Sequence, residues 1–301
     1  MIKKVFLCVF LTFLGNSFAQ TEGFSKNADL SQTYFKIFGT GSPILIINGG
    51  PGMNSNGFEA MAKILAKKHQ TIIYDQRGTG KSTLKNLNSE TISMRLMADD
   101  IETLRKHLKI KKWSILGHSF GGMLACYYAT IYPESIDKLV LSSSGGIDLS
   151  LLEGGNAIES SLSPIEKDSM RYWNIKIQNG DTSHGARLAR GRAMAPAYVY
   201  DRKFIPQIAE RLTQGNSTIN SLLWNDMQKT KFDCKPNLKS FQKPVLIIQG
   251  KQDIVSKEIG EIALETFPNA KMVLLENCKH YGWLDAEEKY FAEIESFLDS
   301  K

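Results

Sequence analysis

The sequence has few cysteines, and no group of cysteines and histidines stands at the spacing of a metal site. With only 4 cysteines in 301 residues, a fold held together by a disulfide framework is excluded. The spacing gives no reason to expect a metal or any other cofactor. Lysine and arginine number 37 against 31 acidic residues and form no dense run. The composition therefore does not favour a nucleic-acid partner.

Long hydrophobic runs are also missing, except near the N-terminus. Two lysines precede an apolar stretch from Val5 to Leu14, and Ser17-Phe18-Ala19 follows, with small residues at the positions that signal peptidase requires. This layout predicts a signal peptide over residues 1–19, which is too short to span a bilayer. We therefore expect an exported protein, periplasmic or secreted, with no stable membrane anchor.

Three cysteines would remain after cleavage, so at least one thiol must be unpaired. One of them, Cys126, lies in an apolar helical pattern and is expected to be a small core residue. Export would permit one disulfide, and the sequence leaves open whether one forms among Cys126, Cys234 and Cys278.

Short apolar runs rich in β-branched residues alternate along the chain with longer segments of helical periodicity. The predicted strands are Thr33–Phe38, Ile44–Asn48, Thr71–Tyr74, Trp113–Leu116, Lys138–Ser142, Val245–Gln249 and Lys271–Leu275. The predicted helices are 57–68, 91–109, 120–132, 257–267 and 286–299. This alternation is typical of an α/β fold, in which helices cover both faces of a mostly parallel sheet. An active site is then expected at the carboxyl ends of the strands.

The alternation stops between about Gly146 and Pro236, where helical periodicity continues without clear strands. We interpret residues 147–236 as a helical cap inserted into the α/β core. The core itself is then formed by residues 20–146 and 237–301.

A nucleophile is expected at the end of the strand that begins at Trp113. The strand is followed by Gly117-His118-Ser119-Phe120-Gly121 and then by a helical run. This is the G-x-S-x-G elbow in its expected strand–turn–helix context. Ser119 is the predicted nucleophile, and the backbone N–H of Phe120 is a predicted donor to the oxyanion. The side chain of His118 should point elsewhere, and the alternative is a plain tight turn that happens to contain serine.

A serine nucleophile needs a base and an acid that orients the base. His280 follows the last predicted strand, and Asp253 follows the strand before it, so both stand at the expected edge of the sheet. The order Ser119, Asp253, His280 is the one that this type of elbow requires. The alternative for Asp253 is a helix N-cap, although Ser256 is better placed for that role. A second oxyanion donor is predicted in the N–H of Gly50, in a glycine-rich turn.

Three stretches make the chain resemble the α/β-hydrolases, and among them the prolyl aminopeptidase (proline iminopeptidase) group. These are Gly49-Gly50-Pro51-Gly52, the segment Tyr74-Asp75-Gln76-Arg77-Gly78-Thr79-Gly80-Lys81-Ser82, and the elbow. The resemblance implies an α/β-hydrolase fold with a cap, a Ser-His-Asp acyl-enzyme mechanism and a supporting role for the Asp-Gln-Arg-Gly segment. Gly80-Lys81-Ser82 is not the end of a phosphate-binding loop, because Asp75 stands where that motif requires glycine.

The chain departs from the family at two places. Asn48 precedes the Gly-Gly-Pro-Gly stretch, where the family has histidine, and the tryptophans of the cap are each followed by asparagine rather than by glutamate. A substrate ammonium group would need a carboxylate from the cap. The predicted cap candidates for substrate binding are Glu153, Glu159, Glu210 and Trp224.

We therefore expect an exported serine hydrolase that releases an N-terminal residue from short peptides. One alternative is a carboxylesterase or lactonase with the same triad. The other is a non-catalytic binding protein of the same fold. The expected partner is a small molecule or short peptide, and the sequence does not predict an oligomeric state.

Overall fold

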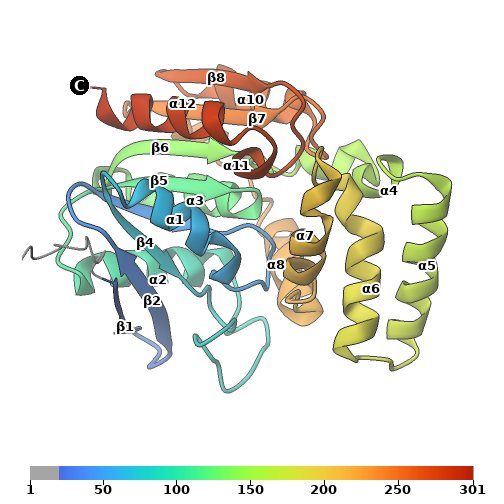
Figure 1. Ribbon diagram of the computed structural model, residues 1–301. Helices are drawn as coiled ribbons and strands as arrows, with labels where there is room; N and C mark the ends of the chain where they lie inside the picture. Colours follow the sequence, from blue (N-terminus) through green and yellow to red (C-terminus); the bar gives the residue numbers. More distant parts are fainter. Residues whose placement is uncertain (1–19, 301) are drawn as a thin grey trace, which may run out of the picture.

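A single sheet of eight strands organises the computed structural model, which describes residues 20–300 (Figure 1). The strand order is β1-β2-β4-β3-β5-β6-β7-β8. All neighbours from β4 to β8 pair in parallel, whereas β1 pairs with β2 and β2 with β4 in antiparallel fashion. The strands are β1 (Gln20–Lys26), β2 (Gln32–Phe38), β3 (Pro43–Ile47), β4 (Gln70–Tyr74), β5 (Trp113–His118), β6 (Ile136–Ser142), β7 (Val245–Gly250) and β8 (Ala270–Leu275).

The predicted mostly parallel sheet is confirmed by the strand pairing, and its central strands are buried along their whole length. Every residue of β5 and of β7 is buried, as expected for strands that carry helices on both faces. The strand that sequence reasoning missed is β1, an antiparallel edge strand whose sequence, QTEGFSK, is mostly polar and mostly exposed. The predicted signal peptide, residues 1–19, lies outside the described residues.

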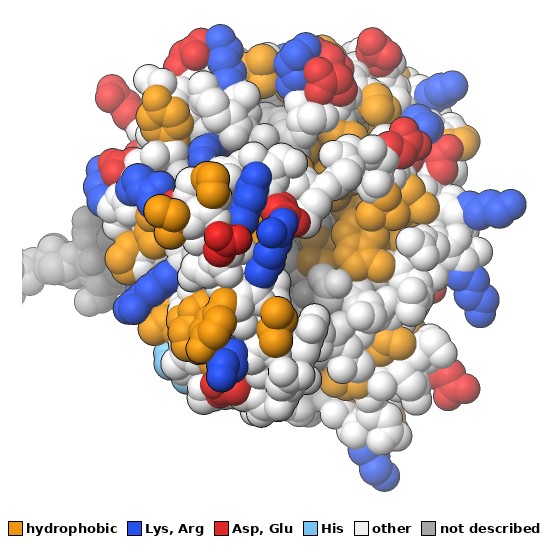
Figure 2. All heavy atoms as spheres, turned by 90° about the vertical axis from the view of Figure 1, so that its right-hand side faces the viewer, with side chains coloured by type: hydrophobic (Ala, Val, Ile, Leu, Met, Phe, Trp, Pro, Cys, Tyr) orange, Lys and Arg blue, Asp and Glu red, His pale blue; other side chains and the backbone are white. Residues whose placement is uncertain are grey.

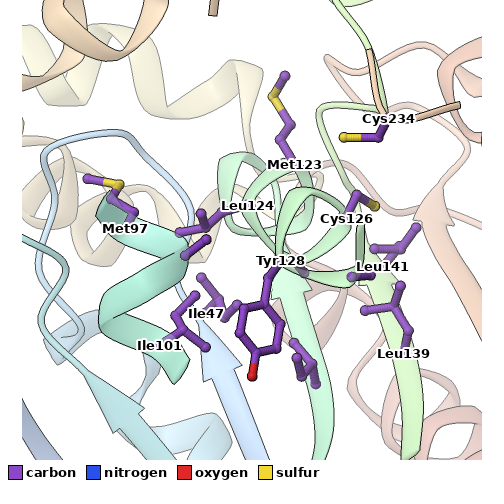
Figure 3. Packing of buried hydrophobic residues seen from close by; sticks show 14 of the residues in the cluster. Ile47, Met97, Ile101, Met123, Leu124, Cys126, Tyr128, Leu139, Leu141 and Cys234 are labelled. Carbon is purple, nitrogen blue, oxygen red and sulfur yellow. The ribbon is translucent and has the colours of Figure 1, made fainter. Parts of the chain in front are cut away.

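Two hydrophobic clusters hold the helices of the core against the two faces of the sheet. Helices α2, α3 and α10 pack on one face, whose centre is shown in Figure 3, and α1, α11 and α12 contribute to the other. The ranges are α1 (Glu59–Leu65), α2 (Met94–His107), α3 (Phe120–Ile131), α10 (Lys257–Thr266), α11 (Gly282–Asp285) and α12 (Glu287–Asp299). All three cysteines of the described residues are free and buried, and Cys126 is part of the first cluster.

The segment that we interpreted as a cap contains most of the remaining helices, and these lie beyond the carboxyl ends of the strands (Figure 1). Its ends are tied together where they leave the sheet, because Cys234 N–H donates to the carbonyl of Ile147 at 2.8 Å and Asp148 forms a β-bridge with Asp233. The helices are α4 (Ala157–Ser160), α5 (Pro164–Gln178), α6 (His184–Met194), α7 (Ile205–Leu212) and α8 (Ser217–Lys229). Helix α9 (Lys235–Leu238) follows at the return to the core, where Leu238 is part of the same hydrophobic cluster as α3.

The cap is anchored to the core through α8. Ile219, Leu223 and Met227 of this helix are fully buried in the same cluster as α2 and α3. Asp226 accepts a hydrogen bond from the N–H of Met94, the first residue of α2, at 2.8 Å. In residues 20–300 no helix is long and apolar enough to cross a membrane.

Candidate active site

Ser119 stands in a strained turn between β5 and α3. Its backbone angles are φ 54° and ψ −121°, a conformation that costs a non-glycine residue about 1–3 kcal/mol. Neighbouring backbone groups hold the turn: Ser119 N–H donates to the carbonyl of Ser142 at 3.0 Å, and Gly145 N–H donates to the carbonyl of Ser119 at 3.1 Å. The turn presents the side chain at the amino end of α3.

The two glycines of the elbow motif allow strand and helix to approach each other. A Cβ on Gly117 would lie 2.4 Å from the carbonyl oxygen of Gly121, and a Cβ on Gly121 would lie 2.2 Å from that of Ile47. Both distances are far inside van der Waals contact, and the atoms that would be struck belong to backbone. The spacing of the motif is therefore a packing requirement of this turn.

Asp253 and His280 meet at the carboxyl edge of the sheet. His280 Nδ1 lies 2.7 Å from Asp253 Oδ1, and the two side chains are 4% and 0% exposed. The same carboxylate oxygen accepts a hydrogen bond from the N–H of Val255 at 3.0 Å. The loop of His280 is fixed through its own N–H, which donates to the carbonyl of Tyr198 in the cap at 3.0 Å. The geometry thus brings together the histidine and the acid that the sequence singled out.

The ring of His118 packs against the ring of His280. The ring centroids of the two histidines are 4.7 Å apart, and Trp283 packs edge-on against His118 at 4.8 Å. His118 Nδ1 lies 3.1 Å from the carbonyl oxygen of Ser142. Burial, followed by the neighbouring His280, lowers the pKa of His118 well below its ordinary value. His118 is therefore a neutral packing partner of the predicted base.

The glycine-rich loop after β3 lies directly against the serine. A Cβ on Gly49 would be 2.8 Å from the Cβ of Ser119, so only glycine fits there. Gly50 adopts φ 77°. Within residues 20–300 the N–H groups of Gly50 and Phe120 have no hydrogen-bond acceptor. Both N–H groups, which the sequence predicts as oxyanion donors, are thus unpaired within the part of the chain that the structure describes.

Asn48, which precedes the Gly-Gly-Pro-Gly stretch, has a structural role in this loop. Its side-chain amide donates to the carbonyl oxygens of Met53 at 2.9 Å and of Gly49 at 3.1 Å. The main-chain carbonyl oxygen of Asn48 accepts a hydrogen bond from Gln76 Nε2 at 2.7 Å. The residue therefore closes the turn that carries Gly50.

The Asp-Gln-Arg-Gly segment supports the same loop from the other side. One carboxylate oxygen of Asp75 accepts from the N–H and the hydroxyl of Ser55, at 2.9 and 2.8 Å. Its second oxygen accepts from Lys81 N–H at 2.8 Å. Arg77 forms a bidentate ion pair with the buried Asp100. The segment thus holds the residues on either side of the glycine-rich stretch, since Gln76 binds Asn48 and Asp75 binds Ser55, and it is tied to α2 by Arg77.

The cap residues predicted to bind substrate have other partners or face solvent. Glu159 forms an ion pair with Arg171, and Glu210 lies 3.4 Å from His184 with 57% of its side chain exposed. Glu153 is exposed, and Trp224 packs against the hydrophobic cluster of the core. These four residues stay predictions as substrate contacts. Figure 2 views the cap side of the molecule and shows a hollow with hydrophobic side chains along part of its wall.

Sequence reasoning missed a buried arginine at the border of cap and core. Arg211 of α7 is only 5% exposed, and its guanidinium donates to the carbonyl oxygen of Gly49 at 3.1 Å. A single arginine on an amphipathic helix gives no signal of this burial. In residues 20–300 no three His, Cys, Asp or Glu side chains are grouped to hold a metal ion.

Comparison with known proteins finds one family model that covers most of the chain. The model for the alpha/beta hydrolase fold matches residues 42–287. A proline iminopeptidase from Lactobacillus helveticus is 27% identical over 292 residues, with 89% of this chain and 94% of the relative covered. A proline iminopeptidase from Heyndrickxia coagulans is 28% identical, with 93% and 99% covered.

Solved structures show the same fold at lower identity. An esterase from Exiguobacterium antarcticum superimposes with a TM-score of 0.72 at 20% identity, over 93% of this chain and 100% of that one. A meta-cleavage product hydrolase from Pseudomonas fluorescens superimposes with a TM-score of 0.72 at 22% identity, over 92% and 98%.

Proposed function

Because this chain belongs to the alpha/beta hydrolase fold family and is a serine hydrolase related to the proline iminopeptidases, we propose that Ser119, His280 and Asp253 form its catalytic triad. The observation that carries this proposal is the 2.7 Å contact between His280 Nδ1 and Asp253 Oδ1. The ring of His118, the residue that precedes Ser119 and its strained turn, lies 4.7 Å from the ring of His280 between their centroids.

In the proposed mechanism, His280 Nε2 takes the hydroxyl proton as Ser119 Oγ attacks the substrate carbonyl carbon. Asp253 accepts the hydrogen bond from Nδ1, which holds the imidazole in the required tautomer and stabilises the imidazolium. The N–H groups of Phe120 and Gly50 bind the tetrahedral oxyanion. His280 then protonates the leaving group, and water, activated by the same histidine, releases the acyl group from Ser119. Each oxyanion donor of this kind contributes about 3–4 kcal/mol to catalysis.

We propose short peptides with a free N-terminus as the substrates, from which the N-terminal residue is released. Support comes from the proline iminopeptidases, which match nearly the full length of this chain. The test is a panel of aminoacyl-naphthylamides, proline among them, beside acyl esters. Turnover of the naphthylamides by the wild type, and none by Ser119→Ala, is the expected result. Hydrolysis of esters alone would refute the peptidase assignment.

One observation favours acyl esters as a second candidate substrate class. A substrate ammonium group needs a carboxylate, yet the acids of residues 147–236 are exposed or engaged by other parts of the chain. No acid of this segment forms a hydrogen bond or ion pair with Ser119 or His280 in the described residues. These acids are Asp148, Glu153, Glu159, Glu166, Asp168, Asp181, Asp201, Glu210, Asp226 and Asp233. The same panel decides between the two classes.

Labelling with a fluorophosphonate tests the triad itself. Such a probe reacts with an activated serine, so the wild type should be labelled rapidly and Ser119→Ala should not. His280→Gln should lose labelling while it keeps the fold. Equal labelling of wild type and Ser119→Ala would place the nucleophile elsewhere.

We further propose that the protein is exported and cleaved after Ala19. Gln20, which would become the first residue, pairs with Phe38 in the sheet, so cleavage there leaves every described strand intact. The intact mass of protein recovered from the culture medium or periplasm tests this. A mass that retains residues 1–19 would refute it.

A further inference from the structure

The cap and the loop of the proposed oxyanion donor are built against each other. Asn216 N–H, between α7 and α8, donates to the carbonyl of Gly52 at 3.2 Å, and a Cβ on Gly52 would lie 2.7 Å from the carbonyl oxygen of Asn216. The side chain of Met53 packs beside Gly50 on one side and reaches Gly215 on the other. The loop after β3 is therefore held by the cap segment that begins at Arg211.

Arg211 makes three further hydrogen bonds at this border. Its Nη2 donates to the carbonyl oxygen of Gly49 at 3.1 Å, and its Nη1 donates to that of Asn54 at 3.1 Å and to Gln214 Oε1 at 3.0 Å. The guanidinium carbon lies 5.0 Å from the ring centre of Phe58. A Cβ on Gly57 would lie 2.6 Å from Arg211 Cδ, so the loop has a glycine where the arginine passes.

The charge of Arg211 has no acidic partner in residues 20–300. All its hydrogen bonds go to neutral oxygens, although burying an unpaired charge is costly. Burial lowers the pKa of the guanidinium below its ordinary value. An apolar side chain could fill this position at a lower cost in desolvation free energy. The presence of a guanidinium is therefore better explained by its hydrogen bonds to the loop after β3.

The bond to Gly49 has a direct geometric consequence. The carbonyl of Gly49 and the N–H of Gly50 belong to one planar trans peptide unit and point in opposite directions. The carbonyl oxygen of Gly49 accepts from Arg211 and also from the side-chain amide of Asn48. Because these two bonds together fix the carbonyl, they fix the N–H of Gly50 toward the opposite side. Glycine on both sides of this peptide gives the unit little resistance to rotation of its own. A cationic donor on the carbonyl also polarises the peptide, which strengthens its N–H as a donor.

We propose that Arg211 is a positioning residue of the oxyanion site: by binding the carbonyl of Gly49 from the cap, it orients and polarises the Gly50 N–H toward the developing oxyanion. This inference rests on the proposed function, in which Gly50 is one of two oxyanion donors. It makes the cap a structural part of the catalytic machinery as well as a cover over the substrate.

The test compares Arg211→Met with the matched control Arg190→Met in the hydrolysis of para-nitrophenyl acetate. Arg190 of α6, which is partly buried, is likewise a cap arginine without an ion pair in the described residues, but it donates to Asn174 Oδ1 inside the cap, at 2.5 Å. Arg211→Met should lower kcat about 30- to 100-fold with KM within about threefold, because a misdirected donor acts on the transition state. Arg190→Met should leave kcat within about threefold.

A second variant perturbs the arginine without removing it. Gly57→Ala places a methyl group against Arg211 Cδ and should displace the guanidinium, lowering kcat about tenfold. In the Arg211→Met background the same change should have little further effect, because the two substitutions act on one contact. Thermal melting of each variant shows whether it folds. If Arg211→Met does not fold, the kcat of Gly57→Ala still tests whether displacing the guanidinium impairs catalysis.

A tetrahedral inhibitor gives a readout that loss of packing would not move. Phenyl trifluoromethyl ketone forms an adduct with a serine hydroxyl whose oxyanion needs the same donors, so its Ki should rise in Arg211→Met by the factor lost in kcat/KM. Unchanged kcat in Arg211→Met, a loss confined to KM, or an equal loss in Arg190→Met would each overturn the inference. Wild-type activity in Ser119→Ala would instead refute the proposed function.

Discussion

Replacing Asp253 by asparagine isolates the charge of the proposed triad acid. Oδ1 of this carboxylate accepts hydrogen bonds from His280 Nδ1 and from the N–H of Val255. Oδ2 is buried and has no hydrogen-bond partner within residues 20–300. An asparagine can therefore keep its oxygen at the Oδ1 position and its NH2 group at the Oδ2 position. The imidazole then keeps its tautomer, and only the negative charge is lost.

The expected loss follows from the distance between the charges. The heavy-atom contact is 2.7 Å, which places the centres of the carboxylate and imidazolium charges about 4 Å apart. At an effective dielectric constant of about 20, this attraction amounts to about 4 kcal/mol. Because the imidazolium forms on the way to the transition state, the loss should appear as a decrease of about a thousandfold in kcat. Asp253→Ala should lose at least as much, since it also removes the acceptor that orients the ring.

The assay is the steady-state hydrolysis of a para-nitrophenyl ester, with thermal melting to show that each variant folds. Glu276→Gln is the matched control, because it removes an exposed carboxylate from the same histidine loop, where Glu276 pairs with Lys251. The control should keep wild-type kcat. Retention of more than about a tenth of wild-type kcat by Asp253→Asn would refute the electrostatic reasoning.

Three further predictions concern packing and protonation. Gly121→Ala, whose Cβ would strike the carbonyl oxygen of Ile47 at 2.2 Å, should lower the free energy of unfolding in urea by about 3 kcal/mol. Gly154→Ala meets nothing within 4 Å and should raise it by up to about 1 kcal/mol; the opposite order would contradict the packing argument. The lowered pKa of His118 means that the unfolded chain binds a proton below about pH 6.5 that the folded chain does not, so stability rises as the pH increases through that range. His118→Phe should flatten the slope of unfolding free energy between about pH 6 and 5 by about 1 kcal/mol per pH unit, and an unchanged slope would mean that His118 titrates alike in both states. Finally, Ellman's reagent should react with Cys126, Cys234 and Cys278 only after the protein is unfolded. All three thiols are buried, and burial raises their pKa values. Fast reaction with the native protein would contradict this prediction.

The sheet was predictable because its central parallel strands, such as β5 and β7, are buried on both faces. Such strands are continuous apolar runs, and β2 to β8 were expected within one or two residues of their observed ends. Edge strand β1 lacks that signal, because its sequence, QTEGFSK, is mostly polar and contains a glycine, as is typical of a loop. Antiparallel pairing with β2 rather than local hydrophobicity determines its conformation.

The site was predictable to the extent that strand ends determine it. Asp253 and His280 follow neighbouring strands β7 and β8, so the topology alone brings them together. Arg211 could not be found in this way, because its burial depends on a loop more than 150 residues away in the sequence. The orientation of the His118 ring likewise follows from the packing of Phe58 and Trp283 around it.

The segment that leads from the sheet to the cap and the segment that returns lie side by side, because Ile147 and Cys234 are joined by a backbone hydrogen bond. Strands β6 and β7 are therefore neighbours whatever number of residues the excursion between them contains. The entropic cost of lengthening that excursion grows only with the logarithm of its length. Helices α5 and α6 could accordingly be exchanged for others, and a new substrate preference acquired, while the machinery at the strand ends remains undisturbed.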